Sequence, residues 1–467
     1  MTDAVLIANR GEISVRIARA CRALGLRSVA VFSEADRGAL FTKVADEAVC
    51  IGPAPAKHSY LNFAAVVSAA QVTGANWIHP GYGFLSENAD FAALLEQVNI
   101  GFIGPKPETM FTWGHKLRSR HEAQKYGVPV LPGSEPLSDL EHAFAEANRI
   151  GYPLMLKATS GGGGRGLRVV RTKRELERGF ADTQKEMAIG FGASQLYLEK
   201  LLEEPKHIEL QVLGDGTGNI WIFGDRECSL QRRHQKVIEE APSPTLTDSQ
   251  RAELLPSARA AMQAARYLGL GTLEFLRGAD GRLFFVEMNT RLQVEHPVTE
   301  LVFGIDLVQL QIKAVLGLPL GLPLGLAGQQ LWRPRGHAIE CRVNAEDPWR
   351  MFPSAGTVHS CSWPGGPGIR VDTGIETGSI VPPDYDSMLA KVIAFGCNRD
   401  EAISRMRGAL LETRVEGVRT NLDLHLALLE NVEVLRGTMT TQTLDRLMKS
   451  SQGSGAVVAP SSAVAQL

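Results

Sequence analysis

Gly271-Thr-Leu-Glu-Phe-Leu276, followed after a short connection by Arg282-Leu-Phe-Phe-Val-Glu-Met-Asn289, is the stretch of sequence that decides the fold. Apolar and polar residues alternate in both segments, and Asp280-Gly281 between them is a typical turn pair, so the sequence predicts an antiparallel hairpin. A connection of two or four residues places Glu274 and Glu287 on one face, directly or diagonally opposite. A three-residue connection would separate them.

The two acids of this hairpin suggest a metal site. Like charges that face each other across a pair of strands destabilise the sheet unless something neutralises them. Asn289 lies on the same face by the two-residue repeat of a strand. Two carboxylates and an amide oxygen suit Mg²⁺ that bridges nucleotide phosphates, so we predict Glu274, Glu287 and Asn289 as its ligands. Two solvated strand acids are the alternative.

The alternation continues beyond the hairpin, where Asn289 is followed by Thr-Arg-Leu-Gln-Val-Glu-His-Pro297. Arg291, Gln293 and Glu295 therefore follow on the same face. An arginine and a carboxylate beside a metal site can hold a small anion and remove a proton from it.

A donor-rich stretch lies upstream, at Arg226-Glu-Cys-Ser-Leu-Gln-Arg-Arg-His-Gln-Lys-Val237. Such a stretch is usually a solvated run of charges. Its interleaved Gln231, His234 and Lys236 would also suit a polyphosphate and an anion of the size of bicarbonate.

A glycine-rich segment, Lys157-Ala-Thr-Ser-Gly-Gly-Gly-Gly-Arg-Gly-Leu167, lies between two apolar strand patterns. Consecutive glycines expose backbone N–H groups that can surround phosphate oxygens, and Lys157 and Arg165 add positive charge. A Walker loop is excluded because Leu167-Arg168 follows Gly166 where Lys-Ser/Thr is required. A flexible hairpin turn is the alternative interpretation.

The composition is that of an ordinary globular protein. The 467 residues suggest about three domains, and 49 basic against 51 acidic residues give a net charge of −2, without the basic excess of a nucleic-acid-binding protein. No signal peptide and no apolar run near ~18 residues is present, so a membrane location is not expected. The six cysteines form no C-x-x-C pair, which fits a reducing compartment, and we expect a cytoplasmic protein.

The first hundred residues alternate short apolar strands with amphipathic helices. Strands are expected at 4–8, 28–32, 48–51, 77–79 and 101–103, with helices near 60–72 and 89–98. After the first strand, Asn9 and Glu12 form the pattern of a capping box that begins a helix. This alternation predicts a parallel sheet with helices on both faces. The G-x-G-x-x-G of a dinucleotide-binding loop is missing.

The rest of the chain divides into three predicted parts. Residues 114–330 mix helix and hairpin signals, and the Gly/Leu/Pro-rich segment 317–326 is predicted to be a linker. A third region, 331–446, has strands near 337–343 and 388–395 and helices at 399–411 and 421–429. The last residues, 447–467, are rich in Ser, Gly, Ala and Val and are predicted to be a disordered tail. The predicted domains are therefore 1–113, 114–330 and 331–446.

The chain resembles the biotin carboxylases over about residues 1–446. The resemblance is carried by Ile7-Ala-Asn-Arg-Gly-Glu12, His79-Pro-Gly-Tyr-Gly-Phe-Leu-Ser-Glu-Asn88, the loop 161–166, Gln231-Arg-Arg-His-Gln-Lys236, Glu287-Met-Asn-Thr-Arg-Leu-Gln-Val-Glu-His-Pro297, Glu340-Cys-Arg-Val-Asn-Ala-Glu-Asp347 and Tyr385-Asp-Ser-Met388. It implies a multidomain α/β and α+β fold, with a Rossmann-like N-terminal biotin carboxylase domain, a central ATP-grasp domain and a mixed α+β C-terminal domain.

The resemblance also implies roles for single residues on the nucleotide side. ATP would be bound by Lys116, Lys157, Gly161, Gly162, Gly163, Gly164, Glu199, Leu202, His207, Gln231, His234 and Leu276, of which Glu199, Leu202 and Leu276 would meet the base. Mg²⁺ or Mn²⁺ would be held by Glu274 and Glu287, with Asn289 close by.

On the substrate side, the resemblance implies that bicarbonate is held by Lys236, Arg291, Gln293, Val294 and Glu295. Glu295 would be its general base, and Arg342 and Tyr82 would hold the ureido ring of biotin. The catalytic residues would be Arg291, Glu295, Arg342 and Lys236.

The implied reaction is the carboxylation of biotin by ATP and bicarbonate through carboxyphosphate. The chain has no Ala-Met-Lys-Met biotinylation sequence, so a separate biotin carboxyl carrier protein and separate carboxyltransferase subunits are expected. The resemblance suggests a homodimer, and acetyl-CoA carboxylase of fatty acid biosynthesis is the default complex. Another acyl-CoA, pyruvate or urea as final acceptor, another ATP-grasp carboxylate–amine ligase, and a non-catalytic paralogue are the alternatives.

Overall fold

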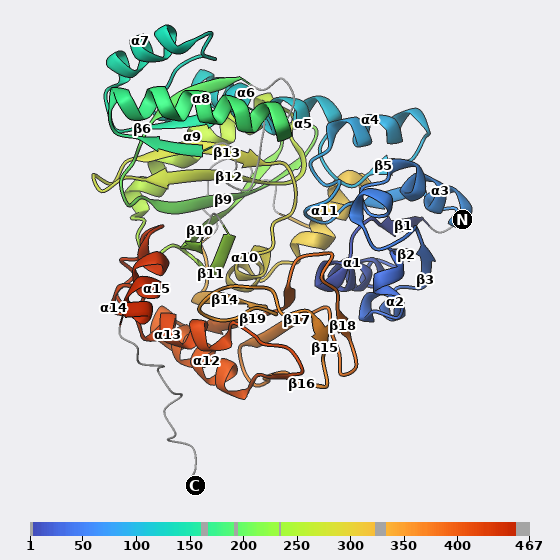
Figure 1. Ribbon diagram of the computed structural model, residues 1–467. Coiled ribbons are helices and arrows are strands. Elements are labelled where there is room, and N and C mark those ends of the chain that lie inside the picture. Colours follow the sequence, from blue (N-terminus) through green and yellow to red (C-terminus); the bar gives the residue numbers. More distant parts are fainter. Residues whose placement is uncertain (1–2, 160–166, 191–194, 233–234, 323–332, 454–467) are drawn as a thin grey trace, which may run out of the picture.

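The first part of the chain folds around a five-stranded sheet, as the strand–helix alternation predicts (Figure 1). The structure is a computed structural model that describes residues 3–159, 167–190, 195–232, 235–322 and 333–453. The strand order is β3-β2-β1-β4-β5, and all neighbouring strands are parallel. The elements are β1 (Ala4–Ile7), α1 (Gly11–Ala23), β2 (Arg27–Phe32), α2 (Leu40–Val44), β3 (Glu47–Cys50), α3 (Phe63–Thr73), β4 (Trp77–His79), α4 (Ala89–Gln97), β5 (Gly101–Phe102) and α5 (Pro107–Trp113).

The capping box predicted at Asn9 is wrong. Helix α1 begins at Gly11 after Arg10, without a side-chain cap. The Asn9 amide instead donates to the carbonyl oxygens of Pro80, at 2.6 Å, and Tyr82, at 2.7 Å. Strands β1 and β4 are neighbours in the sheet, so their carboxyl ends meet, and Asn9 there has long-range partners that a local pattern does not reveal.

A small antiparallel sheet follows, in the order β7-β6-β8, with α7 and α8 packed against it. Its apolar side chains form a separate core with those of the two helices. The elements of this part are α6 (Lys116–Lys125), α7 (Leu140–Ile150), β6 (Leu154–Ala158), β7 (Leu167–Val170), α8 (Lys173–Gly190) and β8 (Leu196–Lys200).

An antiparallel sheet of eight strands forms the body of the molecule, in the order β13-β12-β9-β10-β11-β14-β19-β17. Strand β11 pairs with β14, so the sheet continues across the boundary predicted at residue 330. One side of β9 is apolar, with Ile208, Leu210 and Val212 in one core with α9. The strands before the boundary are β9 (Lys206–Asp215), β10 (Ile220–Arg232), β11 (Gln235–Ala241), β12 (Leu268–Arg277) and β13 (Leu283–Asn289), with helices α9 (Asp248–Ala264), α10 (His296–Phe303) and α11 (Leu307–Val315).

The predicted hairpin is β12 and β13, and Glu274 lies directly opposite Glu287, as predicted. The way the chain reaches this register differs from the prediction. Arg277 pairs with Leu283, so the connection has an odd number of residues and would by itself separate the two acids. An irregularity in β13 after the Phe275–Phe285 pair shifts the register by one residue and restores the opposition.

The C-terminal part adds the last strands of the large sheet and a group of helices. Its elements are β14 (His337–Asn344), β15 (Gly356–Thr357), β16 (Ser360–Ser362), β17 (Ile369–Thr373), β18 (Ile380–Val381), β19 (Met388–Gly396), α12 (Arg399–Glu412), β20 (Arg414–Glu416), α13 (Leu422–Glu430), α14 (Val432–Leu435) and α15 (Thr443–Gly453). The tail predicted to begin at 447 is wrong up to 453, because α15 continues to that residue and Leu444 and Met448 are buried in the core. Residues 454–467 lie outside the described part of the chain.

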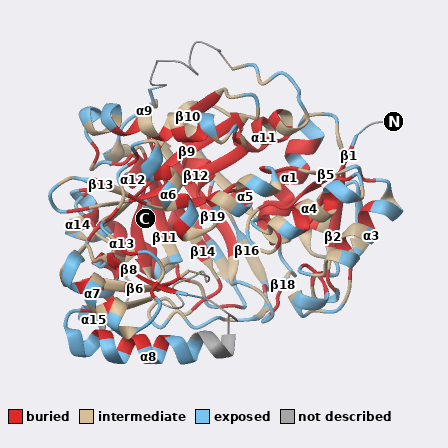
Figure 2. Cartoon of the chain, turned by 90° about the horizontal axis from the view of Figure 1, so that it is seen from above, coloured by how far each residue is buried: buried red, intermediate tan, exposed pale blue. Residues whose placement is uncertain are grey.

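Burial follows the sheets rather than the outer helices (Figure 2). The strands of the large sheet are mostly buried, whereas α8 exposes much of its surface. Among the helices that the structure describes, none is long and apolar enough to cross a membrane.

Candidate active site

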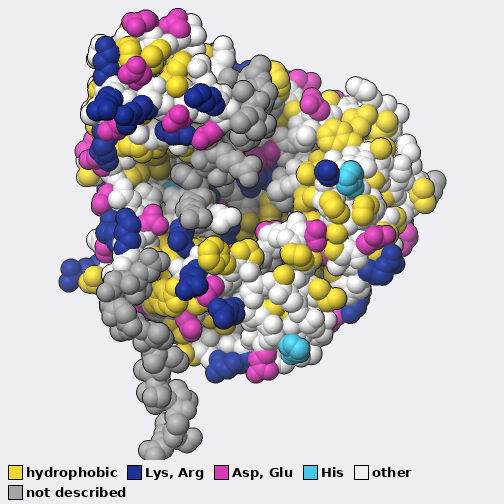
Figure 3. Space-filling model, in the orientation of Figure 1, with side chains coloured by type: hydrophobic (Ala, Val, Ile, Leu, Met, Phe, Trp, Pro, Cys, Tyr) yellow, Lys and Arg dark blue, Asp and Glu magenta, His cyan; other side chains and the backbone are white. Residues whose placement is uncertain are grey.

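A cavity of about 690 Å³ lies between the small sheet and the polar side of the large sheet. The face of the molecule shown in Figure 3 is hollowed near its centre. Nearly all predicted site residues that the structure describes line the cavity, namely Lys116, Lys157, Glu199, Leu202, His207, Gln231, Lys236, Glu274, Leu276, Glu287, Asn289, Arg291, Gln293, Val294, Glu295 and Arg342. Gly161, Gly162, Gly163, Gly164 and His234 lie outside the described residues. Tyr82 is described but does not line the cavity.

Four charged residues stand in one row across the large sheet. Glu287 is opposite Glu274, Glu274 is opposite Glu209, and Glu209 is opposite Arg226. The sequence interpretation did not include Glu209. The sequence did indicate that Glu209 lies on the polar face, because His207, Glu209 and Gln211 alternate with apolar residues and so share one face of β9.

The paired acids have opposite pKa shifts. Burial raises the pKa of Glu287, and the charge of Glu274 raises it further. Burial would also raise the pKa of Glu274, but Lys236 and His207 outweigh it and lower that pKa, with His207 Nε2 3.0 Å from Glu274 Oε2. The pair therefore consists of two buried carboxylates with unequal pKa values, and a divalent cation between them would favour the ionised form of both.

Asn289 lies beside these acids but faces them with its nitrogen. Its Nδ2 donates to Glu274 Oε1 at 2.6 Å, and its Oδ1 accepts from Arg291 Nη2 at 2.8 Å. Rotation of the amide would present the oxygen to a cation between the acids. The two carboxylates start from directly opposite positions, and the amide would need this rearrangement to join them as a ligand.

Lys236 and Glu295 form the centre of the charged side of the cavity. Lys236 Nζ lies 2.7 Å from Glu295 Oε1 and 3.2 Å from Glu274 Oε1, and it also contacts Glu209. Burial would lower the pKa of Lys236, but the three acids raise it well above its ordinary value. Burial would raise the pKa of Glu295, but Lys236 and Arg342 hold it well below the ordinary value. Glu295 is therefore ionised.

Arg342 reaches the same carboxylate from the neighbouring part of the sheet. Its Nη2 lies 3.0 Å from Glu295 Oε2, and its Nε donates to Glu239 Oε1 at 2.7 Å. Burial raises the pKa of Glu239 to about 7. The backbone oxygen of Arg342 accepts hydrogen bonds from Asn421, at 2.9 Å, and His425, at 2.7 Å. Arg342 is therefore held both at its backbone oxygen and at its guanidinium.

Arg226 lies behind this site and was not assigned a role from the sequence. It is fully buried and donates to Gln293 Oε1 at 2.6 Å and to Glu209 Oε2 at 2.9 Å. Gln293 in turn donates to Glu274 Oε1 at 2.9 Å. Arg226 thus connects the segment after β13 to the row of acids.

The side of the cavity next to the small sheet is more apolar. Met155, Val169, Leu202 and Leu276 line it, together with the mostly buried ion pair between Lys157 and Glu199. Burial lowers the pKa of Lys116. The wall also includes three residues at and before the start of α15, which the sequence interpretation missed because it gave that region no function: Thr441, Gln442 and Asp445.

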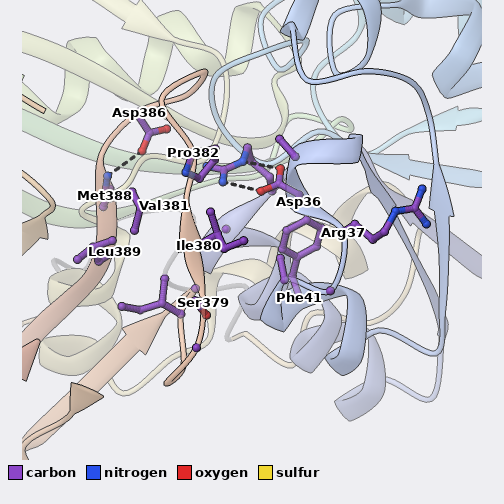
Figure 4. Close-up of a pocket in the computed structure, with 18 residues that line it drawn as sticks. Asp36, Arg37, Phe41, Ser379, Ile380, Val381, Pro382, Asp386, Met388 and Leu389 are labelled. Atoms are coloured by element: carbon purple, nitrogen blue, oxygen red, sulfur yellow. Dashed lines mark hydrogen bonds and ion pairs between the residues drawn. The ribbon is translucent and has the colours of Figure 1, made fainter. Parts of the chain in front are cut away.

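Tyr82 lies toward the N-terminal sheet, where its hydroxyl donates to Glu12 Oε1. A second cavity, of about 110 Å³, lies where the N-terminal part meets the C-terminal part (Figure 4). In it Asp36 faces residues of the segment from Ser379 to Leu389, and its carboxylate accepts hydrogen bonds from Arg10 at 2.7 and 2.8 Å. The smaller cavity is not the candidate site, because none of the predicted site residues in the described part of the chain lines it.

Each part of the chain is similar to known proteins. Residues 1–110 match the N-terminal domain of biotin carboxylase, 115–322 the ATP-binding domain of the carbamoyl-phosphate synthase L chain, and 340–446 the C-terminal domain of biotin carboxylase. The chain is 49% identical over 448 residues to the biotin carboxylase of Pseudomonas aeruginosa, covering 96% of this chain and 98% of the relative.

Two solved structures are similar over nearly the whole chain. A biotin carboxylase complex described as β,γ-ATP, from Campylobacter jejuni, has a TM-score of 0.91 and 42% identity, covering 96% of this chain and 99% of the other. The biotin carboxylase domain dimer of Hydrogenobacter thermophilus 2-oxoglutarate carboxylase, in complex with MgADP, ADP and bicarbonate, has a TM-score of 0.88 and 43% identity, covering 96% and 98%.

Proposed function

The chain belongs to the biotin carboxylase family of ATP-dependent ligases, and we propose that it carboxylates the biotin of a separate carrier protein as the first half-reaction of acetyl-CoA carboxylase. One observation carries the assignment of residues. Glu295 contacts both Lys236 and Arg342 in the cavity that also holds the opposed acids Glu274 and Glu287.

The first step needs a nucleophile from bicarbonate. Glu295 takes the proton of bicarbonate, while Lys236, Arg291, Gln293 and the Val294 segment hold the anion. The resulting oxygen attacks the γ-phosphorus of ATP, the bond to ADP breaks, and carboxyphosphate forms. The low pKa of Glu295 reflects the cations beside it. Two anionic substrates would share these cations, so the pKa of Glu295 would rise toward that of a useful base.

Phosphoryl transfer depends on position and on the neutralisation of charge. Lys116 and Lys157 are placed to bind the phosphates, and the Lys157–Glu199 ion pair keeps that ammonium in the cavity wall. Glu274 and Glu287 would hold Mg²⁺ or Mn²⁺, which when bound would neutralise phosphate charge. The apolar residues Leu202 and Leu276 would cover the base.

The second step transfers the carboxyl group to biotin. When the ureido nitrogen loses its proton, negative charge develops on the ureido oxygen, and the fixed guanidinium of Arg342 is suited to stabilise it. The nitrogen attacks the carboxyl carbon of carboxyphosphate, the bond from that carbon to the phosphate oxygen breaks, and the departing phosphate accepts the proton that the ureido nitrogen gives up. Tyr82 stays a proposed contact of the ureido ring, which the carrier-bound biotin would reach from the N-terminal side.

The proposed partners are a biotin carboxyl carrier protein, carboxyltransferase subunits and a second copy of this chain. A relative solved as a dimer supports the homodimer. That relative belongs to a 2-oxoglutarate carboxylase, so the fold also serves other acceptors. Acetyl-CoA is proposed here as acceptor, in the cytoplasm, and isolation of the carboxyltransferase bound to the chain would identify it.

The proposed function is tested by bicarbonate-dependent ATP cleavage with the purified chain, free biotin and Mg²⁺. We expect biotin to stimulate ADP formation, and labelled bicarbonate to appear in carboxybiotin. ADP formation that requires a different carboxylate and an amine, with no carboxybiotin, would instead favour another ATP-grasp ligase.

A further inference from the structure

Lys391 lies in the middle of β19 and is fully buried, and it has no role in the proposed function. It lies opposite Arg342 of β14 on one side and opposite Asp372 of β17 on the other. Taking an ammonium group out of water costs several kcal/mol unless charged or polar partners compensate. The partners of Lys391 therefore indicate its function.

Three acceptors surround the ammonium group. Lys391 Nζ donates to the backbone oxygen of Val294 at 2.9 Å and lies 3.1 Å from Glu12 Oε1 and 4.0 Å from Asp372 Oδ2. The Val294 oxygen and Glu12 are within hydrogen-bond distance of the ammonium, and Asp372 adds negative charge at longer range. Burial would lower the pKa of Lys391, but Glu12, Glu340 and Asp372 raise it, so the group is charged.

Glu12 brings the N-terminal part of the chain to this lysine. It lies in the first turn of α1, is 3% exposed, and also accepts a hydrogen bond from Tyr82. The approach of the two parts is close at Gly374, where an added Cβ would lie 2.6 Å from the Glu12 nitrogen. Helix α1 is thus pressed against the end of β17, and a larger residue at 374 would move Glu12 away from Lys391.

The bond to Val294 acts on the segment that precedes the proposed base. Val294 and Glu295 share a planar trans peptide, in which C=O and N–H point in opposite directions. Because Lys391 holds the Val294 oxygen, it fixes the plane of this peptide and directs the Glu295 N–H away from itself. The contact with Lys391 therefore fixes the point at which the Glu295 side chain leaves the backbone.

Other buried ion pairs already hold the three parts of the chain together. Arg16 of α1 lies 2.8 Å from Glu300 of α10, and Arg370 of β17 donates to the other oxygen of Glu300 at 2.7 Å. These pairs can hold the parts together without the Glu12–Lys391 pair. The contact of Lys391 with Val294 indicates that the Glu12–Lys391 pair acts on the segment around Val294.

We propose that Lys391, held by Glu12, is a positioning residue for the bicarbonate segment. It fixes the Val294–Glu295 peptide and joins that segment to Glu12 and Tyr82 of the N-terminal part. The inference rests on the proposed function, because it assumes that Gln293, Val294 and Glu295 hold bicarbonate.

The variant Lys391→Met tests the inference, since it keeps the length of the side chain and removes all three donors. We expect the KM for bicarbonate to rise, and kcat to fall, by about 10- to 100-fold, as for a misplacement of reacting groups by roughly 1 Å. The KM for ATP should change less than about twofold. Lys391→Gln can still donate to Val294, and its bicarbonate KM should lie between those of the wild type and Lys391→Met.

Arg399→Met is a matched control, because Arg399 is also a mostly buried cation, bonded to Glu240 at 2.7 Å, but does not line the large cavity. This variant should lose stability and keep both KM values. Bicarbonate and ATP KM values that rise together in Lys391→Met, or an unchanged bicarbonate KM, would overturn the inference.

If Lys391→Met does not fold, Glu12→Gln keeps the volume at the junction and removes the charge that holds the ammonium. It should raise the bicarbonate KM more than the ATP KM, and wild-type kinetics would overturn the inference. An active wild type with unaffected variants would reject only this inference, whereas a wild type without bicarbonate-dependent ATP cleavage would reject the proposed function and the inference together.

Discussion

On the side proposed to bind bicarbonate the large cavity holds charged groups in contact with one another, whereas the side proposed to bind the nucleotide presents more apolar side chains. Lys236, Glu295 and Arg342 are joined by ion pairs of 2.7 and 3.0 Å. Across the cavity, Leu202 and Leu276 are part of a wall in which Lys157 pairs with Glu199.

This difference reflects the ligands that each side is proposed to bind. Bicarbonate is small and offers little surface, so charges that are already fixed must supply its binding and activation. A nucleotide base is large and flat, and burial of its apolar faces supplies affinity with few polar contacts. Substitutions on the two sides should therefore differ in which kinetic constant they change and by how much.

Glu295→Gln should have the largest effect. It keeps the size of the side chain and removes the proton acceptor, so bicarbonate-dependent ATP cleavage should fall by about 10²- to 10⁴-fold. The measurement is kcat for ADP formation at saturating bicarbonate, with ATP affinity measured separately. Glu240→Gln is the control, because Glu240 is a buried acid bonded to His337 and Arg399 outside the cavity. Equal losses in the two variants would contradict the role of Glu295.

Arg342→Ala should impair the carboxylation of biotin without weakening nucleotide binding. Removal of the guanidinium should lower carboxylation of biotin by about 10²- to 10³-fold, the usual cost of losing an oxyanion stabiliser, while nucleotide binding stays unchanged. Labelled carboxybiotin and equilibrium binding of ATP are the two measurements. Carboxybiotin formed at the wild-type rate would exclude the assigned role.

Glu287 lies where the two sides meet, and the substitution Glu287→Gln should weaken metal binding. Loss of one charged ligand should weaken the apparent affinity for Mg²⁺ by about 10- to 100-fold, as for other disturbed metal sites. Burial and Glu274 raise the pKa of Glu287, so the neutral amide removes an unfavourable buried charge, and the variant should fold at low Mg²⁺ as well as the wild type does. Titration of ATP cleavage with Mg²⁺ measures the shift, and an unchanged Mg²⁺ dependence would exclude Glu287 as a ligand.

Leu276→Ala should have the smallest effect and should be limited to the nucleotide side. The loss of about two to three buried methylene equivalents, at ~0.8 kcal/mol each, corresponds to a rise of roughly tenfold or more in the Kd for ATP, with the bicarbonate KM unchanged. Leu283→Ala is the matched control, because Leu283 is buried in the core on the other side of the hairpin. A bicarbonate KM that rises in Leu276→Ala would show that the two sides are not independent.

Part of the chemistry of the site was predictable because it follows the two-residue repeat. Glu274 and Glu287 were predicted from alternation, and they pair across β12 and β13. Arg291 and Glu295 were predicted from the same alternation and line the cavity, but β13 ends at Asn289, so these two residues lie between that strand and α10 and not in a strand. Glu209 follows the same rule on β9 but lies in a stretch without any other signal of function.

Other features were not accessible to local patterns. The Asn9 amide has the local pattern of a helix cap but bonds to carbonyls of residues 80 and 82, which reach it only through the pairing of β1 with β4. The register irregularity in β13 compensates for an odd connection, so the correct pairing of the acids was predicted with the wrong connection.

The sequence by itself determined which residue types face one another along each strand, since side-chain direction in a strand depends only on position in the repeat. It therefore determined that Glu274 and Glu287 share a face, and the alternation of strands with helices determined the N-terminal parallel sheet. The tertiary structure alone decided the pairing of β11 with β14, which brings Arg342 to Glu295 across 47 residues and Lys391 to Val294 across 97. Such contacts depend on which strands become neighbours, and that choice is made by the packing of the whole chain.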